Sequence, residues 1–448
     1  AAWVLTLTFA VVILAWRAPR FDPEHPGRPL PARLGTAVDS AATRWVLAIG
    51  GLLFWLWVGA AALFGPQDNR NALPGTFYVL LWVGLVAVSV LFGPVWRAIS
   101  PLRTVARLLP GAFAGRRSYP ASWGYVPGAV GLFAFVWLEL ASPDPAALGA
   151  IRWWLLVYVV AVLGGAAVYG RRWFARADPF EVYSVVASRL SPLRRNTHGQ
   201  IVIGNPFDHL PTLPVRRGTV TVLAVLLGST AFDSFSAMPQ WRGLLDRYAD
   251  SPWAACAVRT GALLLFVTVV GVTFWGAARA TGGVGADRRK LLPGLLAHSL
   301  IPIVIGYVFA HYLSYLVERG QQTLVRLADP LGRGWNLLGL GHAEVSYVLS
   351  MHPTVVATLK VLSVVLGHIA GVVAARDALT AARQSVGEGE DVPDEAALKA
   401  ALDGIVQAGG AGAEQGQAGV GEHAGDVLAG DDDAADAREV VGAEALGE

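Results

Sequence analysis

The chain has 448 residues, of which 54% are hydrophobic and only 15% are charged, and its mean hydropathy is +0.48. A soluble domain carries about 25% charged residues, so this composition excludes an ordinary soluble globule. The single cysteine, Cys256, excludes a disulfide framework and a cluster of thiolate metal ligands within one chain.

Long apolar stretches recur along the chain. A membrane-spanning helix needs about 20 mainly apolar residues. Nine stretches meet or approach this length, and in chain order they are residues 1–16, 45–64, 76–96, 120–142, 151–169, 218–238, 260–278, 291–317 and 353–375. The sequence therefore predicts an all-α, polytopic membrane domain over residues 1–383.

Basic residues alternate from one connecting loop to the next. The loops after the first, third and fifth predicted spans contain five, five and eight arginines, whereas those after the second and fourth contain one and none. Because Lys and Arg favour the cytoplasmic side, we expect a plasma-membrane protein with its N-terminus outside and its C-terminus inside. Two basic segments, 96–113 and 180–193, also carry an apolar stripe, which predicts interfacial helices that contact membrane lipids.

The last 65 residues, 384–448, differ sharply from the rest. The segment after Gln384 holds 16 acidic and two basic residues, a net charge of about −14, against about +16 for the first 384 residues. This segment is rich in Gly and Ala and contains no aromatic residue. Such a composition cannot bury enough apolar surface to offset its ordering entropy, so we predict a disordered acidic tail.

Several ionisable side chains fall inside or at the edge of the predicted spans, where they are costly and usually face a bundle interior or a cavity. They are Asp233, Arg259, His298, His311, His352, Lys360 and His368. At a rise of about 1.5 Å per residue, His311 and His352 lie at one outer level, close to the depth of Asp233. His298 and His368 lie together at an inner level, where they are further candidate metal ligands.

Two histidines and one carboxylate are a common ligand set for a metal ion that keeps open positions. We therefore predict an outer site in which His311, His352 and Asp233 hold a divalent metal ion such as zinc, with Tyr307 or Tyr315 assisting. A bound metal ion lowers the pKa of its water to about 7 and can supply hydroxide for hydrolysis. The leading hypothesis is thus a metal-assisted hydrolase in the membrane.

Other interpretations of the same residues stay open. Lys360, also a candidate catalytic residue, could snorkel to the interface or pair with Asp233 on the ion pathway of a transporter. Paired histidines also suggest haem, but steps of 13 and 16 residues put the members of each pair on opposite helix faces, against two stacked haems. Each histidine could equally be a hydrogen-bonding contact between helices.

Motifs of soluble enzymes are absent from the sequence. No H-E-x-x-H, G-x-x-x-x-G-K-[ST] or G-x-S-x-G occurs. The basic residues are spread over loops at the membrane rather than gathered in one patch, so we predict no nucleic-acid binding.

Several stretches together resemble a known family. They are AWRAPRF at 15–21, FGPVWRAISPLRTV at 92–105, DPFEVYSVVASRLSP at 178–192, AFDSFS at 231–236, AHSLIPIVIGYVFAHYLSYLVERGQ at 297–321, DPLGRGWNL at 329–337 and GHIAGVVAARDA at 367–378. In this order the chain is similar to actinobacterial multi-pass membrane proteins named fenitrothion hydrolase. The resemblance implies hydrolysis of an apolar organophosphate ester that enters from the lipid, and it points to Asp233, His298, His311 and His368.

Overall fold

The computed structural model describes residues 8–12, 15–282, 284–341 and 343–387. Within them, eight helical segments are long and apolar enough to cross a membrane: Ala41–Phe64, Leu73–Phe92, Ala121–Leu140, Leu148–Tyr169, Thr219–Ser236, Pro252–Ala280, Arg289–Ala328 and Pro353–Gln384. They correspond to the second to ninth predicted spans, which confirms the predicted helical architecture and the presence of several helices able to cross a membrane. Most of the first predicted span, and the predicted acidic tail beyond residue 387, lie outside the described residues.

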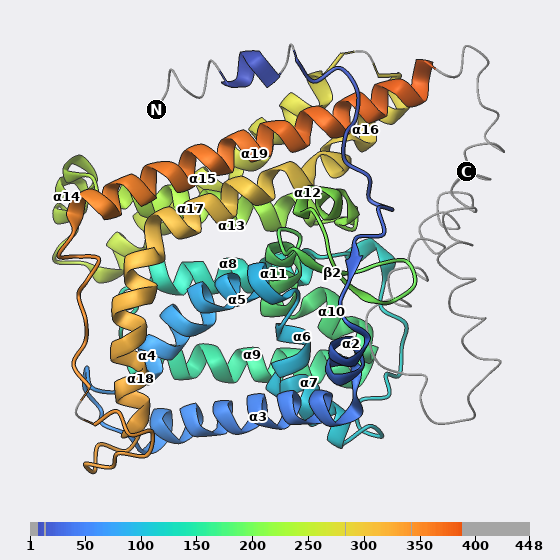
Figure 1. Ribbon diagram of the computed structural model, residues 1–448. Coiled ribbons are helices and arrows are strands. Elements are labelled where there is room, and N and C mark those ends of the chain that lie inside the picture. The colour runs from blue at the N-terminus through green and yellow to red at the C-terminus, as the bar shows by residue number, and fades with distance from the viewer. Residues whose placement is uncertain (1–7, 13–14, 283, 342, 388–448) are drawn as a thin grey trace.

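The long helices are those that the apolar runs dictate. They are α3 (Ala41–Phe64), α5 (Leu85–Phe92), which continues the π-helix η1 (Thr76–Gly84), α8 (Val126–Leu140), α9 (Leu148–Tyr169), α13 (Thr219–Ser236), α15 (Pro252–Ala280), α17 (Leu300–Ser314) and α19 (Pro353–Gly387). They run side by side, and their connections alternate between two ends of the bundle (Figure 1). We call the end that carries the loops 17–40 and 170–218 the arginine-rich end.

Shorter helices complete the bundle. They are α2 (Ala32–Asp39), α4 (Leu73–Gly75), α6 (Trp96–Ile99), α7 (Pro101–Leu108), η2 (Ala121–Trp123), α10 (Arg171–Ala177), α11 (Pro179–Ser188), α12 (Pro206–His209), η3 (Leu210–Thr212), α14 (Pro239–Asp246), α16 (Ala286–Leu295), η4 (Ala297–Ser299), η5 (Tyr315–Arg319) and α18 (Gly320–Ala328). A small antiparallel sheet of order β1-β3-β2 lies at the arginine-rich end, with strands Arg28–Pro29, Ile201–Ile203 and Leu193–Arg195 respectively.

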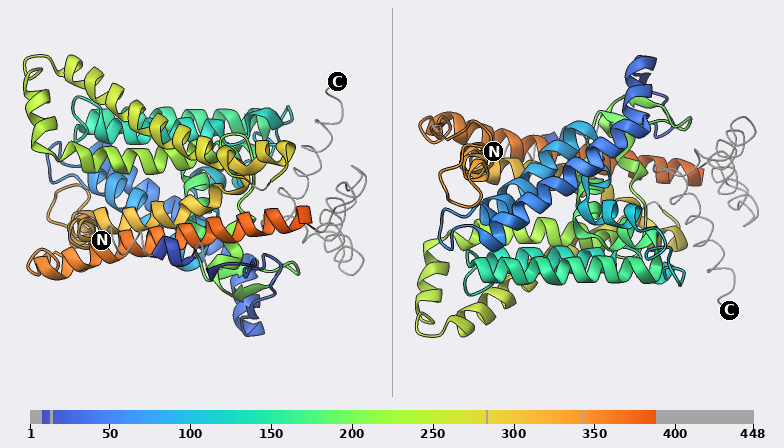
Figure 2. Two further views of the ribbon diagram at one scale, coloured as in Figure 1. Left: turned by 90° about the horizontal axis from the view of Figure 1, so that it is seen from above. Right: turned by 90° about the horizontal axis from the view of Figure 1, so that it is seen from below.

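Close helix packing at glycines fixes one side of the bundle. A Cβ atom on Gly306 of α17 would lie 2.5 Å from the Ser363 carbonyl oxygen, and one on Gly367 of α19 would lie 2.6 Å from the Pro302 carbonyl oxygen. Small residues of this kind let membrane helices approach closely where no hydrophobic effect drives them together. Helix α19 thus lies along α17, on the opposite side of the bundle from α3 (Figures 1 and 2).

The position of α11 (Pro179–Ser188) differs from the one predicted for its segment. Segment 180–193 is predicted to be interfacial, yet all ten residues of α11 are buried, and the helix packs on α5, α8, α10 and α17. The apolar stripe underestimates the burial of α11, because Val185 and Ala187 lie outside the stripe and are buried as well. Its polar residues Glu181 and Ser184 are also buried, since other helices supply their hydrogen-bond partners. At ten residues α11 is too short to span a membrane, so it is a partial helix enclosed by the bundle.

Candidate functional site

One predicted site residue, Asp233, makes polar contacts across a helix interface. Asp233 lies near the end of α13, and its Oδ2 atom lies 2.9 Å from the Nε2 atom of His311 on α17. The hydroxyl of the next residue, Tyr312, donates to the same Oδ2 atom at 2.6 Å. The side chains of His311 and Asp233 remain 34% and 20% exposed. The Asp233–His311 pair is therefore held in place by Tyr312 and remains partly accessible to solvent.

Glu139 of α8 extends this polar region, although its position near a helix end suggests a solvated side chain. The residue is half-buried, and its Oε2 atom is buried without a hydrogen-bond partner among the described residues. Helix α8 packs on α13, and the Glu139 carboxyl group lies within electrostatic range of the Asp233 carboxyl group. The sequence signal for Glu139 was a carboxylate one residue before the end of an apolar run. The depth of a residue along a helix, however, does not show whether its side chain points into the bundle.

The central helix α11 contributes one more group to this region. The hydroxyl of Tyr183 is buried without a hydrogen-bond partner in the described part of the chain, and the charge of Glu139 acts on it. Tyr183 also stacks on Trp82, with ring centroids 4.5 Å apart. We call Glu139, Tyr183, Asp233, His311 and Tyr312 the acidic cluster. It gathers titratable groups from four helices, with two carboxylates and no salt bridge from Lys or Arg to them among the described residues.

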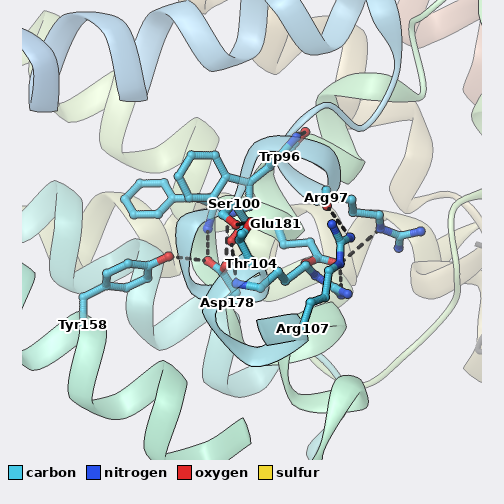
Figure 3. Close-up of polar contacts among 11 residues, drawn as sticks. Trp96, Arg97, Ser100, Thr104, Arg107, Tyr158, Asp178 and Glu181 are labelled. Atoms are coloured by element: carbon cyan, nitrogen blue, oxygen red, sulfur yellow. Dashed lines mark hydrogen bonds and ion pairs between the residues drawn. The ribbon is translucent and has the colours of Figure 1, made fainter. Parts of the chain in front are cut away.

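A second polar group, which sequence analysis missed, lies at the first turn of α11 (Figure 3). Glu181 is fully buried and accepts from two guanidinium groups. Arg103 donates from Nε to Oε2 at 2.6 Å and from Nη2 to Oε1 at 2.7 Å, and Arg97 donates from Nε to Oε1 at 3.1 Å. This two-pronged geometry is the strongest form of carboxylate pairing that arginine offers. We call Arg97, Arg103, Asp178 and Glu181 the arginine cluster.

Asp178 is also fully buried, and both of its carboxylate oxygens accept hydrogen bonds. Its Oδ1 atom accepts from the Phe180 amide at 3.0 Å, which caps α11, and from the Tyr158 hydroxyl at 3.1 Å. Its Oδ2 atom accepts from the Trp96 indole at 2.9 Å (Figure 3). The prediction assigned the arginines of loop 96–113 to lipid contact. In the structure two of them neutralise Glu181 instead, and the cluster holds α11 between α6, α7 and α9.

The other predicted site residues do not join the Asp233 pair. His352 is exposed, and its Nδ1 atom lies 2.7 Å from the Val348 carbonyl oxygen. The Nδ1 atom of His368 lies 2.8 Å from the Val364 carbonyl oxygen, and its ring lies 5.8 Å from that of Tyr307. His298 is buried in η4. The contacts of these three histidines therefore do not include Asp233.

Lys360 and Tyr315 also remain outside the acidic cluster. Lys360 is exposed on α19, and no ion pair joins it to Asp233 in the described part of the chain. Its position suits a side chain that snorkels toward the interface. Tyr315 is 38% exposed. Helix periodicity places Tyr315 near the face of His311, but the neighbouring Tyr312 reaches the carboxylate.

The predicted metal site is not assembled in the described residues. No group of three or more His, Cys, Asp or Glu side chains there is placed to hold a metal ion. His311 and Asp233 supply two donor atoms, whereas a catalytic zinc site needs about three protein ligands. The donor set therefore does not fit the metal centre that the sequence predicts.

One histidine outside the spans has a strongly altered titration. Burial and the neighbouring Arg189 guanidinium lower the pKa of His209 in α12 to about 3. The Nη1 atom of Arg189 lies 3.1 Å from its Nε2 atom. The ring is thus neutral in the folded protein near physiological pH, and it serves the structure of the arginine-rich end.

Comparisons with known proteins found no matching family model, no matching curated protein and no matching solved structure.

Proposed function

We propose that this membrane protein is a transporter or ion-pathway protein that moves protons through the acidic cluster. The observation that supports the proposal is the buried, unpartnered Oε2 atom of Glu139 within electrostatic reach of the Asp233 carboxylate. Ionisable groups inside a membrane domain are costly, and they commonly mark proton or ion pathways. Two carboxylates that no Lys or Arg side chain of the described residues neutralises favour the capture of a cation, the smallest of which is a proton.

The geometry provides an order for the transfer. His311 is the most exposed titratable member and can exchange a proton with water, and its Nε2 atom lies 2.9 Å from Asp233. Glu139 in turn lies within electrostatic range of the Asp233 carboxyl group and of the Tyr183 hydroxyl on α11. A chain of this kind moves a proton by short transfers between neighbouring groups, each of which returns to its starting form.

The partial helix α11 supports the same proposal. The ends of a short helix leave backbone groups without helical partners, and within a membrane domain this is found where the helix is buried in protein or lines a cavity. Transporters place binding sites at such broken helices. Helix α11 carries Tyr183 toward the acidic cluster, and its first turn carries Asp178 and Glu181 into the arginine cluster. It therefore connects the acidic cluster with the arginine-rich end.

Proton flux in liposomes tests the proposal. The purified protein is reconstituted with a pH-sensitive dye inside, and a pH gradient is imposed with valinomycin and potassium to dissipate the membrane potential. We expect Asp233→Asn to reduce the flux to that of empty liposomes, and Asp250→Asn, at an exposed position between α14 and α15, to leave it unchanged. Flux that is equal in the wild type and Asp233→Asn would refute the role of the cluster.

A second candidate function rests on the Asp233–His311 pair itself. A carboxylate bonded to one imidazole nitrogen orients the ring as a general base, and general-base catalysis contributes about 10²–10⁴-fold in rate. The Nδ1 atom of His311 makes no hydrogen bond in the described part of the chain, and the side chain is 34% exposed. Together with the resemblance to fenitrothion hydrolase, this arrangement supports hydrolysis of a nitrophenyl phosphotriester by an activated water.

Release of nitrophenol by detergent-purified protein tests that second function. If His311 is the general base, His311→Ala lowers the rate by about 100-fold or more. Proton flux without ester hydrolysis favours the transporter, and hydrolysis that survives in His311→Ala refutes the hydrolase role of this pair.

A further inference from the structure

A long apolar groove follows the outside of helices α8 and α9. Its volume is about 1110 Å³, and its walls extend from Trp123 and Val126 at the arginine-rich end to Asp144 and Trp253 at the opposite end. The groove is open along the surface, where Val130 and Val157 are 63% and 64% exposed. Helix α9 presents most of its surface outward, with only 17% of its span buried in the protein.

The walls are shaped for a flexible hydrocarbon chain. Small residues leave the space, among them Gly131 and Ala134 on α8 and Ala150 and Ala161 on α9. Aromatic side chains form much of the remaining wall, with Trp137 and Trp154 between the two ends. In a protein that crosses a membrane, such an outward-facing groove meets lipid.

The two ends of the groove carry opposite charge. Arg217 lines the arginine-rich end, where it is exposed and its Nη1 atom donates to the Ser122 carbonyl oxygen at 3.4 Å. Asp144 lines the opposite end. A cation at one end attracts an anionic headgroup and an acid at the other repels it, so the charges define one orientation for an amphipathic ligand.

We propose that the groove between α8 and α9 is a binding site for one anionic phospholipid. The phosphate lies at Arg217, in the leaflet at the arginine-rich end, and an acyl chain lies along the small residues toward Ala150. Trp123 beside Arg217 suits this placement, because tryptophan is favoured at the level of the headgroups. The site is separate from the acidic cluster, and the proposal does not depend on the function proposed for that cluster.

Native mass spectrometry of the full chain in detergent tests the proposal. Phosphatidylglycerol and phosphatidylcholine with identical acyl chains are titrated separately, and the affinity for the first bound lipid is measured. We expect tighter binding of phosphatidylglycerol, and we expect Arg217→Gln to weaken it about fivefold while phosphatidylcholine binding stays unchanged.

Two further variants locate the acyl chain. Ala161 is exposed in the groove, so Ala161→Phe fills the space without disturbing a packed core, and we expect it to reduce binding of both lipids. The matched control is Ala357→Phe, the same substitution at an exposed position on α19 outside the groove. Equal effects of these two variants, or equal affinity for both lipids in the wild type, would show only general lipid contact and would overturn the proposal.

Discussion

The acidic cluster and the arginine cluster lie near α11, but they differ in how completely their charges are paired. Both oxygens of Glu181 and both oxygens of Asp178 accept hydrogen bonds in the arginine cluster. In the acidic cluster, the Oε2 atom of Glu139 has no partner among the described residues, and Asp233 meets only His311 and Tyr312. The first cluster is saturated, whereas the second retains the capacity to accept a proton.

The contrast assigns a structural role to the arginine cluster and a chemical role to the acidic cluster. A buried ion pair fixes geometry, because removal of one partner leaves an uncompensated charge. A buried polar group without a partner weakens the fold, and its retention points to function. The difference also shows that burial of a carboxylate does not by itself indicate a functional site, since Glu181 is the more deeply buried of the two glutamates.

The largest expected effect tests the arginine cluster. We expect Glu181→Ala to destabilise the protein by about 3–5 kcal/mol, because Arg97 and Arg103 lose their carboxylate in a largely buried site. Thermal unfolding in detergent measures the change. The control is Asp68→Asn, which breaks an ion pair whose side chains are 73% and 48% exposed, and we expect a much smaller change in stability because solvent screens this pair. Similar losses in the two variants would contradict the assignment.

A smaller effect is expected where the acidic cluster is hydrogen-bonded. Tyr312→Phe removes the hydroxyl that donates to Asp233, and a hydrogen bond to a charged group contributes about 1.5–3 kcal/mol. The variant should unfold at a lower temperature, and it should retain proton flux because His311 and both carboxylates remain. Complete loss of flux without loss of stability would instead place the tyrosine in the relay.

For Glu139, whose Oε2 atom has no hydrogen-bond partner among the described residues, we expect a change in stability of the opposite sign. Glu139→Gln removes a charge that burial disfavours and that no described side chain compensates, so we expect stability to be unchanged or higher by about 1 kcal/mol. The same variant should lose proton flux in liposomes. A destabilisation comparable to that of Glu181→Ala would show that Glu139 is a structural partner, and the contrast between the clusters would disappear.

The smallest effect at neutral pH concerns His209, outside both clusters. Its folded pKa of about 3 lies below the ordinary value of 6.5, so an unfolded chain takes up a proton that the folded protein does not. The resulting stabilisation is complete above about pH 6.5 and is lost as the pH falls toward 3. Melting temperatures across this window should decline less steeply in His209→Gln than in the wild type. Equal slopes of melting temperature against pH in the wild type and His209→Gln would show that His209 does not cause the loss of stability at low pH.

Helix periodicity predicted part of the acidic cluster. A rise of about 1.5 Å per residue placed Asp233 and His311 at similar depth, and the structure joins them. The same periodicity favoured Tyr307 and Tyr315 as helpers, whereas Tyr312 makes the contact. Sequence spacing shows which residues share a face of one helix, but the packing of α17 on α13 determines which face meets Asp233.

The candidate membrane spans could be read from the amino-acid sequence, because an apolar run of about 20 residues has few alternatives to a membrane helix. The alternation of basic loops is likewise a property of composition along the chain. The roles of Glu139, Asp178 and Glu181 depend instead on how the helices pack. Their charges become costly or satisfied according to the donors that other helices bring to them, and those donors lie far away in the sequence.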